Sequence, residues 1–482
     1  MRALFVASEV HPFSKTGGLA DVAGALPRAL AAQGVETVTV TPLHGSARKH
    51  GLERTPMVLS VPLGGGRIDA RVWRKGDVYF LEHGPFFDRP ELYSGPWGDH
   101  GDNAPRFTFL CRGAIELARR FGGFDILHTH DWQTGLVPVY ARTLYAGEFE
   151  SARTVFTIHN LAYQGQFWHL DVPLTGLDWT LFNWRQLEFY GKLNFMKAGL
   201  VFSDAITTVS PTYSREIRTP EHGHGLDPVL RGRGGAVSGI LNGVDYDEWD
   251  PAKDPHLPAR YSTEDLAGKA ACKAELQKRC GLPVRADVPV VGIVSRLAEQ
   301  KGIDLLLGGL DALLSEDAQY VILGSGDSRF EDGLRHAAGR RRDRLSVHLK
   351  FDNGLAHLIE AGSDLFLMPS KYEPCGLNQI YSLRYGTLPI VRSTGGLADT
   401  VVEGATGFVF GPYTVEAMVE TVRRAVRTWR DPETRHRMIT AGMRQDFSWT
   451  ASARQYAALY DRVLKEAPAV THKPVPPSVP VD

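Results

Sequence analysis

Two loops of this sequence carry residue types that suit an anionic ligand. The hexapeptide TGGLAD occurs at 16–21 and again at 394–399, and Lys15 stands directly before the first copy. Paired glycines let a ligand approach the backbone closely, and a loop that opens a helix leaves N–H groups available to an anion. One copy alone is as easily explained by a tight turn. The second copy and the lysine favour a phosphorylated ligand that both loops bind.

Two further motifs place charged side chains in the second half of the chain. Arg296 and Lys301 lie five residues apart in SRLAEQKG, and Glu373 lies in YEPCG. Negative charge develops on a departing diphosphate, and fixed cations or N–H dipoles that stabilise such charge are usually the largest catalytic effect. Taken alone, however, an exposed arginine or lysine is most often a solvated surface charge. The surrounding motifs therefore have to decide whether Arg296 and Lys301 bind a diphosphate or are solvated surface charges.

The apolar runs of the sequence predict the scaffold that must position these residues. Between the runs 3–8 and 35–42, apolar residues at helical spacing predict a helix within 20–34, with a bend at Pro27. Strand, helix and strand in this order indicate a parallel sheet. Further strands are predicted at 124–130, 153–160, 205–210, 288–295, 318–326, 345–351, 364–370, 388–393 and 407–410. The pattern therefore predicts two doubly wound α/β halves that join near residue 245.

Composition narrows the class of protein further. The 482 residues include 54 Lys and Arg against 55 Asp and Glu, so no net charge attracts nucleic acid or anionic lipid. The four cysteines have no metal-ligand spacing, and no acidic pair is placed to hold a metal, so we expect neither a metal nor a cofactor. We find no signal peptide and no apolar run long enough to span a membrane. These features are typical of a cytoplasmic enzyme.

Nine motifs along the chain resemble, in their order, those of bacterial glycogen synthases, which are similar to plant starch synthases. The motifs that carry this resemblance are KTGGLADV (15–22), HTHDWQTG (128–135), TIHNLAYQG (157–165), VSPTYSREI (209–217), ILNGVD (240–245), VSRLAEQKG (294–302), GSGD (324–327), YEPCGLNQIYSLRYGTLPIVRSTGGLADT (372–400) and DFSW (446–449). The resemblance implies a GT-B fold, in which two Rossmann-like, doubly wound domains flank a central cleft. It implies retaining transfer of glucose from ADP-glucose to the non-reducing 4-OH end of an α-1,4-glucan such as glycogen.

The resemblance also implies domain bounds. An N-terminal acceptor and sugar domain would span 1–244, with a C-terminal helix at 448–465 packing back on it, and Ser448 is a candidate N-cap of that helix. A nucleotide-sugar domain would span 245–447, and a disordered, Pro-rich tail would span 466–482. The oligomeric state stays open.

The resemblance assigns roles residue by residue. It implies catalytic parts for five polar residues, namely Glu373, Asp131, His159, Arg296 and Lys301. It implies substrate contacts from ten others, namely Lys15, Gly17, Gly18, Asp21, Asn242, Cys375, Gly376, Thr394, Gly395 and Gly396. A lone histidine is more often a satisfied buried imidazole, but the TIHNLAYQG motif favours a sugar contact for His159.

Two further features bear on this assignment, namely the residue at position 381 and a cluster of aromatic residues. Related retaining families carry a second glutamate eight residues after the first, where this chain has Tyr381. This favours front-face substitution, in which the departing phosphate takes the acceptor's proton, over a two-carboxylate scheme. Eight aromatic residues lie between 163 and 190, and we expect most to be core, with two or three for the acceptor.

Other functions remain open at this stage. The chain could be another retaining GT-B glycosyltransferase, either one that uses UDP-glucose or one similar to sucrose or trehalose-phosphate synthases. Those synthases would carry glutamate at position 381, where this chain has tyrosine. A glucan-binding relative without catalysis would have lost Lys15, Arg296 or Glu373, and all three are present.

Overall fold

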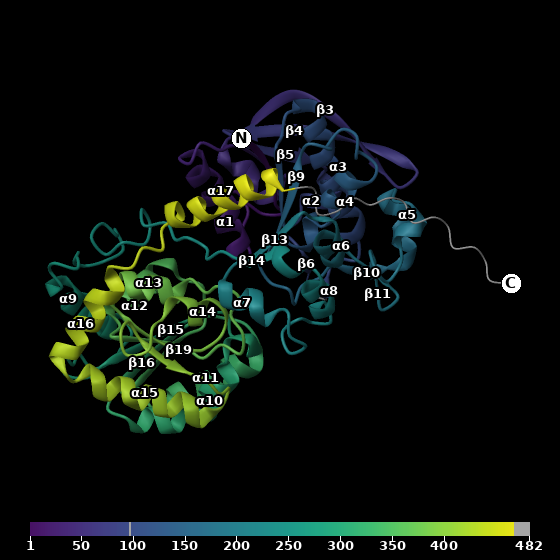
Figure 1. Cartoon of the computed structure of the whole chain (residues 1–482). Coiled ribbons are helices and arrows are strands. Elements are labelled where there is room, and N and C mark those ends of the chain that lie inside the picture. The colour runs from purple at the N-terminus through teal and green to yellow at the C-terminus, as the bar shows by residue number, and fades with distance from the viewer. Residues whose placement is uncertain (96–97, 467–482) are drawn as a thin grey trace. The chain divides into compact units, whose positions relative to one another are not determined.

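The computed structural model describes residues 1–95 and 98–466. Contacts between residues divide the chain into two compact units. Unit 1 comprises residues 1–209, 214–243 and the segment from Trp449, and unit 2 comprises residues 210–213 and 244–448 (Figure 1). Apart from Glu466, the tail expected at 466–482 lies outside the described residues. Within the described ranges, no helix is long and apolar enough to cross a lipid bilayer.

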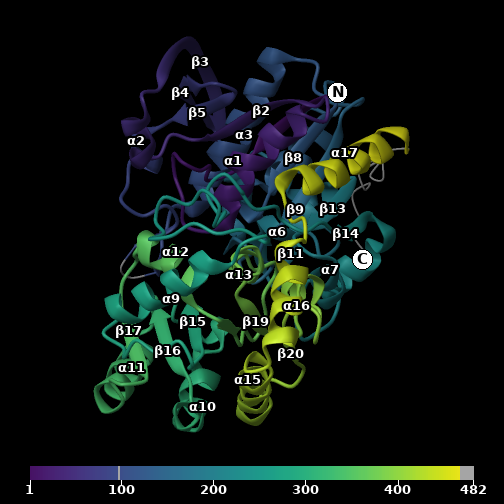
Figure 2. The ribbon, with the colours of Figure 1, turned by 90° about the vertical axis from the view of Figure 1, so that its left-hand side faces the viewer.

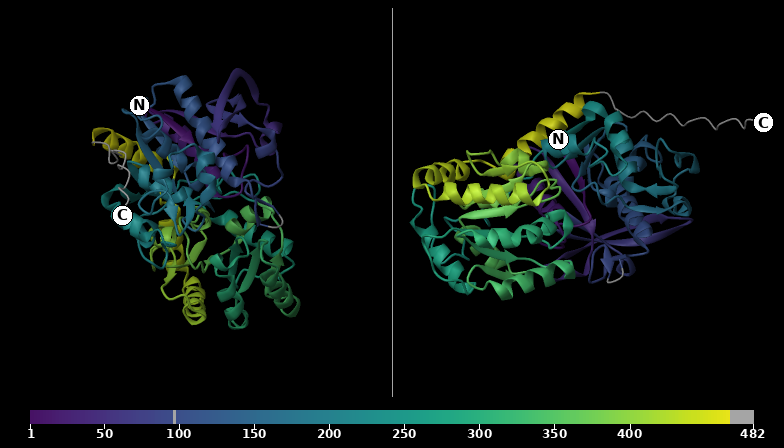
Figure 3. Two further views of the ribbon diagram at one scale, coloured as in Figure 1. Left: turned by 90° about the vertical axis from the view of Figure 1, so that its right-hand side faces the viewer. Right: turned by 90° about the horizontal axis from the view of Figure 1, so that it is seen from below.

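Unit 1 is built on a sheet of nine strands, of which seven are parallel. In spatial order these strands are β14 (Val237–Gly239), β13 (Ala205–Thr208), β9 (Arg153–Ile158), β8 (Ile126–His130), β1 (Arg2–Val6), β2 (Glu36–Pro42), β5 (Val78–Glu82), β4 (Gly66–Lys75) and β3 (Glu53–Leu63). The antiparallel strands β4 and β3 extend one edge (Figure 3). Two small sheets comprise β10 (Gln166–Trp168), β12 (Lys192–Asn194) and β11 (Glu188–Phe189), and β6 (Ser94–Gly95) and β7 (Gly98–Asp99).

The helices of unit 1 connect these strands. They are α1 (Gly18–Ala31), α2 (Gly84–Phe87), α3 (Asn103–Phe121), α4 (Leu136–Arg142), α5 (Val172–Thr175), α6 (Phe195–Phe202), α8 (Asp227–Gly232) and α17 (Trp449–Lys465), while α7 (Pro211–Glu216) spans a boundary between the units. Helix α1 continues through Pro27 and buries Val22, Leu26 and Leu30. Helix α17 packs beside α1, and its Tyr456 and Leu459 join the same core (Figure 1).

Unit 2 is built on a sheet of six parallel strands. In spatial order they are β17 (Leu345–His348), β16 (Gln319–Leu323), β15 (Val290–Val294), β18 (Leu365–Met368), β19 (Leu388–Arg392) and β20 (Phe408–Phe410). Its helices are α9 (Ala267–Arg279), α10 (Ile303–Ser315), α11 (Ser328–Arg340), α12 (Asn353–Gly362), α13 (Asn378–Arg384), α14 (Gly395–Thr400), α15 (Val415–Trp429) and α16 (Pro432–Met443). The strands are almost wholly buried, as expected for a parallel sheet covered on both faces.

Strand order explains why helices cover both faces of the second sheet. Crossovers between parallel strands are right-handed, so α10 and α11, which lead from β15 outward to β17, share one face. Helices α12 and α13 belong to connections that cross the sheet in the opposite direction, toward β18 and β19, and therefore lie on the other face. Figure 2 shows α9, α12 and α13 above the strands and α10, α11 and α15 below them. This arrangement confirms the predicted doubly wound α/β fold class.

Each sheet has one point at which the strand order reverses. In unit 1 it lies between β1 and β8, and in unit 2 it lies between β15 and β18. The helices on the two sides of such a point lie on opposite faces, so the loops after the two strands diverge and leave a crevice for ligands. The fold therefore specifies, within each unit, which loops are placed to bind a ligand.

Candidate active site

The loops at the unit 2 reversal carry three of the five residues expected to be catalytic. Arg296 and Lys301 follow β15, and Glu373 follows β18. The Lys301 Nζ lies 2.6 Å from the Glu373 Oε2, and Ser370 Oγ donates to the same oxygen at 3.0 Å. Glu373 is only 5% exposed, whereas Arg296 is exposed. A buried carboxylate thus has a cation beside it, with a second cation in the same loop.

The second TGGLAD supports the backbone of the Glu373 loop. The Gly396 N–H donates to the carbonyl oxygen of Glu373 at 3.1 Å, and the Thr394 N–H donates to the carbonyl oxygen of Arg392 at 2.9 Å. A methyl group added at Gly395 would stand 1.8 Å from the Glu373 carbonyl oxygen, and one at Gly396 would stand 2.0 Å from that of Cys375. The structure thus differs from the expectation that the amides of Thr394 and Gly396 are available to a ligand.

Cys375 and Gly376 complete this loop. Cys375 is buried and forms no disulfide, and Gly376 has a φ of +72°, which a residue with a side chain rarely adopts. Gln379 Nε2 donates to the carbonyl oxygens of both residues at 3.0 Å. Both therefore hold the turn that follows Glu373, and a direct contact with substrate stays a prediction.

Tyr381 has a packing role in the structure. Its ring stacks on the indole of Trp249 at 3.9 Å between centroids and 6° between planes, and His357 stacks on the same indole at 3.8 Å. His357 is bonded in turn to Asp254 through Nδ1 at 2.7 Å. The position at which related families carry a second glutamate is therefore part of an aromatic stack. The sequence signal for this stack is weak, because Trp249 lies in a turn-rich segment.

Asp131 lies at the unit 1 reversal, and His159 follows β9, the strand next to β8. Asp131 follows β8 with a φ of +56°, a strained value for a residue with a side chain, and such strain often occurs at functional sites. Its Oδ1 accepts the N–H of His159, which follows β9, at 2.7 Å. Burial raises the pKa of Asp131 to about 7, against the effect of hydrogen bonds from the amides of His159 and Asn160. The structure thus brings these two residues together.

His159 is neutral over the physiological pH range. Burial lowers its pKa to about 3, and its Nε2 lies 3.1 Å from the Nδ1 of His130, whose pKa burial also lowers. Because both rings are neutral, one nitrogen of this pair donates and the other accepts. His128, by contrast, is bonded to Thr157 Oγ1 at 2.6 Å and to Tyr460 OH of α17 at 2.7 Å, which indicates a structural role.

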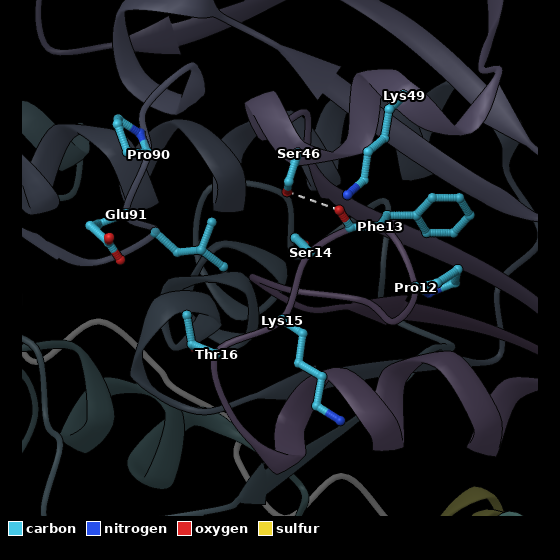
Figure 4. A pocket seen from close by; sticks show the side chains of 10 residues that line it. Pro12, Phe13, Ser14, Lys15, Thr16, Ser46, Lys49, Pro90 and Glu91 are labelled. Carbon is cyan, nitrogen blue, oxygen red and sulfur yellow. Dashed lines mark hydrogen bonds between the residues drawn. The ribbon is translucent and has the colours of Figure 1, made fainter. Parts of the chain in front are cut away.

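The first TGGLAD spans the end of the loop before α1 and the first turn of that helix. Gly17 and Gly18 are exposed, and a methyl group added at Gly18 would meet no heavy atom within 4 Å. Lys15 Nζ forms an ion pair with Asp21 Oδ1 at 2.7 Å. A hollow of about 250 Å³ opens beside the loop (Figure 4). Its lining residues are Pro12, Phe13, Ser14, Lys15, Thr16, Ser46, Lys49, Pro90, Glu91 and Leu92.

A carboxylate that the motifs did not single out lies beneath this loop. Glu9 is only 2% exposed, and its Oε2 accepts the N–H of Thr16 at 2.5 Å and the hydroxyl of the same residue at 2.8 Å. The sequence signal for it was a lone acid within the apolar run FVASEV. Asn242, another expected contact, is buried, and its Oδ1 has no hydrogen-bond partner within the described residues.

The prediction that most aromatic residues between 163 and 190 are core was wrong. Of the eight, only Phe189 is buried, and Phe167 and Phe182 are half-buried. The five exposed ones are Tyr163, Trp168, Trp179, Trp184 and Tyr190. Core burial fails here because the chain between β9 and α6 forms a small three-stranded sheet and short turns, which do not cover large rings on both sides.

Each half of the chain matches the model of a known protein family. Residues 2–232 match the family model of the starch synthase catalytic domain, and residues 277–445 match that of glycosyl transferases group 1. A glycogen synthase of Anaeromyxobacter dehalogenans is 54% identical over 470 residues, which is 95% of this chain and 98% of the relative.

Two solved structures extend this likeness. The catalytic domain of starch synthase IV from Arabidopsis thaliana, bound to ADP and acarbose, is 34% identical, with a TM-score of 0.89 over 96% of this chain and 99% of that one. A sucrose-phosphate synthase from Thermosynechococcus elongatus, 18% identical with a TM-score of 0.58 over 96% of this chain and 98% of its own, shares the fold alone. With a GT-B fold and a glycogen synthase relative at this identity, the chain belongs to the bacterial glycogen synthase family of glucosyltransferases.

Proposed function

We propose that this chain transfers glucose from ADP-glucose to the non-reducing 4-OH end of an α-1,4-glucan such as glycogen, with the anomeric configuration retained. In the cell this reaction would serve glycogen biosynthesis. We also propose a cytoplasmic location, which suits four buried cysteines that form no disulfide, namely Cys111, Cys272, Cys280 and Cys375. Immunodetection of the chain outside the cytoplasmic fraction would contradict this location.

The pairing of Lys301 with Glu373 at the unit 2 reversal is the observation that carries the proposal. A cation 2.6 Å from a nearly buried carboxylate can stabilise the departing diphosphate while the carboxylate contacts the sugar from which it departs. Arg296 supplies a second positive charge from the same loop. The related starch synthase was solved with ADP, which supports an adenine nucleotide as the leaving group.

The chemistry that we propose needs one carboxylate. The bond between the anomeric carbon and the diphosphate oxygen breaks while the acceptor O4 bonds to the same face of that carbon. The proton of the acceptor hydroxyl passes to the departing phosphate oxygen. Stacking of Tyr381 on Trp249 supports this scheme over a two-carboxylate one, because an aromatic ring takes the place of the second acid.

Unit 1 would handle the sugar. Neutral His159 and Asp131 would bond to glucose hydroxyls, and Lys15 and the exposed glycines of the first TGGLAD would contact the sugar and the distal phosphate. Asp21 would position Lys15 through their ion pair. The contacts expected of Asn242, Cys375, Gly376 and residues 394–396 stay predictions, and their clearest role in the structure is to shape the loops.

Initial rates with each nucleotide sugar on a glycogen primer test the donor. We expect kcat/KM for ADP-glucose to be at least about 10-fold above that for UDP-glucose, a preference of about 1.4 kcal/mol. Equal or reversed rates would contradict the proposed donor. Transfer to a sugar phosphate but not to glycogen would instead support a relative of the sucrose or trehalose-phosphate synthases, and no turnover at all would support a glucan-binding protein.

The exposed aromatic side chains of unit 1 are our candidates for the acceptor chain. Trp168, Trp184 and Tyr190 are 63%, 71% and 83% exposed, and aromatic faces stack well on the C–H faces of sugars. Trp184→Ala should therefore raise the KM for glycogen several-fold and leave the KM for ADP-glucose unchanged. Exchange of Leu144, an exposed apolar residue elsewhere in the unit, for alanine is the matched control. A Trp184 variant with an unchanged glycogen KM would remove this residue from the acceptor surface.

A further inference from the structure

The carboxylate of Glu9 is the most unusual group near the first TGGLAD. It accepts both the N–H and the hydroxyl of Thr16, and the N–H of Gly17 also bonds to it. Residues 15–18 themselves are exposed, with no neighbour near the side-chain position of Gly18. The backbone of this turn is therefore held from within by one buried side chain.

The charges around Glu9 are mostly of its own sign. Asp21 of α1 and Asp131 after β8 both interact with it electrostatically, as does the hydroxyl of Tyr93 from the segment before α3. Lys15, the cation of the same loop, forms its ion pair with Asp21. Burial raises the pKa of Glu9 to about 7, although the hydrogen bonds from Thr16 and Gly17 oppose this shift. A charged Glu9 is thus costly to the fold, because within residues 1–95 and 98–466 the buried carboxylate forms no ion pair.

We propose that Glu9 is a positioning residue for the glucosyl transfer, because its carboxylate fixes the backbone of residues 16–18 and so sets where Lys15 and the paired glycines meet the donor sugar. This inference rests on the proposed function for the identity of that sugar. It also explains why an unfavourable buried charge is retained, since natural proteins accept lost stability at sites that need a fixed geometry.

The test separates positioning from mere structural support. Glu9→Gln keeps the shape of the side chain but removes its charge. We expect kcat/KM for ADP-glucose to fall about 10-fold or more, while the Kd of ADP rises by a much smaller factor, because Arg296 and Lys301 of unit 2 supply most of its proposed phosphate contacts. At pH 8 the Tm of the variant should equal or exceed that of the wild type. A merely structural glutamate would instead lower Tm and kcat/KM together, and that result would overturn the proposal.

The pH dependence of stability has a defined sign. The pKa of Glu9 lies above its usual value in the folded protein, so protonation favours folding, and this advantage is lost as the pH rises toward 7. The Tm of Glu9→Gln relative to wild type should therefore increase from pH 5 to pH 8. A difference in Tm that is constant over this range would contradict the account of a costly buried charge.

A second variant tests the route through Thr16. Thr16→Val removes the hydroxyl that donates to Glu9 but keeps the amide. If Glu9 acts through Thr16, the effects of Glu9→Gln and Thr16→Val on kcat/KM will fall short of adding in the double variant, whereas full additivity would overturn the proposal. Glu36→Gln, which removes an exposed carboxylate paired with Arg2, is the control and should change neither rate nor Tm profile. The rates of the wild-type protein with each nucleotide sugar test the proposed function independently of these variants.

Discussion

The two copies of TGGLAD have the same six residues but different surroundings. In unit 1 the glycines are exposed and the turn is bonded to the buried side chain of Glu9. In unit 2 the glycines are buried and packed against the backbone of the loop that carries Glu373. Helix α1 starts at the second glycine of its copy, whereas α14 starts at the first glycine of its own.

This difference shows that a repeated motif can be used for two physical reasons. In the first copy, glycine leaves open space for an approaching ligand. In the second, glycine allows two backbone segments of the protein to come closer than any side chain would permit. The aspartates that end the copies differ likewise, because Asp21 pairs with Lys15, whereas Asp399 accepts the amide and hydroxyl of Thr212 at 2.8 and 2.6 Å.

The largest effect should come from a methyl group in the second copy. Gly395 has a φ of +45°, and its added Cβ would stand 1.8 Å from a carbonyl oxygen, so the backbone would have to move. We expect Gly395→Ala to lower the free energy of unfolding of unit 2 by about 3 kcal/mol or more, and to abolish activity. Denaturant unfolding, followed by a probe in unit 2, measures this. A variant of native stability would refute the packing role of the second copy.

A smaller effect, confined to catalysis, should follow removal of the charge on Glu373. Glu373→Gln keeps the carbonyl oxygen that accepts the Gly396 N–H, so the second copy still packs on this loop. Lys301 loses its charged partner, and we expect kcat to fall about 100-fold or more with little change in Tm. Single-turnover rates and thermal unfolding provide the two measurements. A near-normal kcat would remove Glu373 from the catalytic role.

The smallest effect on stability should come from the matching change in the first copy. Gly18 has open space around its side-chain position, so Gly18→Ala should alter the free energy of unfolding by no more than about 0.5 kcal/mol. If a ligand approaches this turn, kcat/KM for the nucleotide sugar should nevertheless fall several-fold. A destabilised protein would mean that both copies are packing turns, and an unchanged rate would mean that the first is only a turn.

Much of the fold was predictable because buried parallel strands leave a strong signal. Apolar runs such as FDILHTH and VPVVGIVS contain β8 and β15, and the alternation with helices predicted the doubly wound class. The strands β3 and β4 were not predicted, because their solvent-facing residues break the apolar runs. The motifs indicated Lys301, Glu373, Asp131 and His159. The structure places the first three after strands at the two reversals of strand order, and His159 follows the neighbouring strand β9.

Other features depend on contacts between residues far apart in the sequence. The burial of Glu9 requires the turn at Thr16 to fold over it, and the stack of Trp249 on Tyr381 joins residues separated by more than a hundred positions. The exposure of Trp184 and Tyr190 contradicts the usual preference of large aromatics for the core. No local pattern encodes these three outcomes, since each depends on what the surrounding elements cover.

Because α17 belongs to unit 1, it determines when unit 1 can finish folding during synthesis on the ribosome. Residues 244–448 interrupt unit 1 in the chain, yet Tyr456, Tyr460 and Val463 belong to the core that also contains Val22 and Leu26. Domains generally fold as units, often while synthesis continues. The nascent first half must therefore wait, with one face of α1 uncovered, until residues 449–465 have been synthesised. The inserted unit has no such delay and is complete when residue 448 emerges.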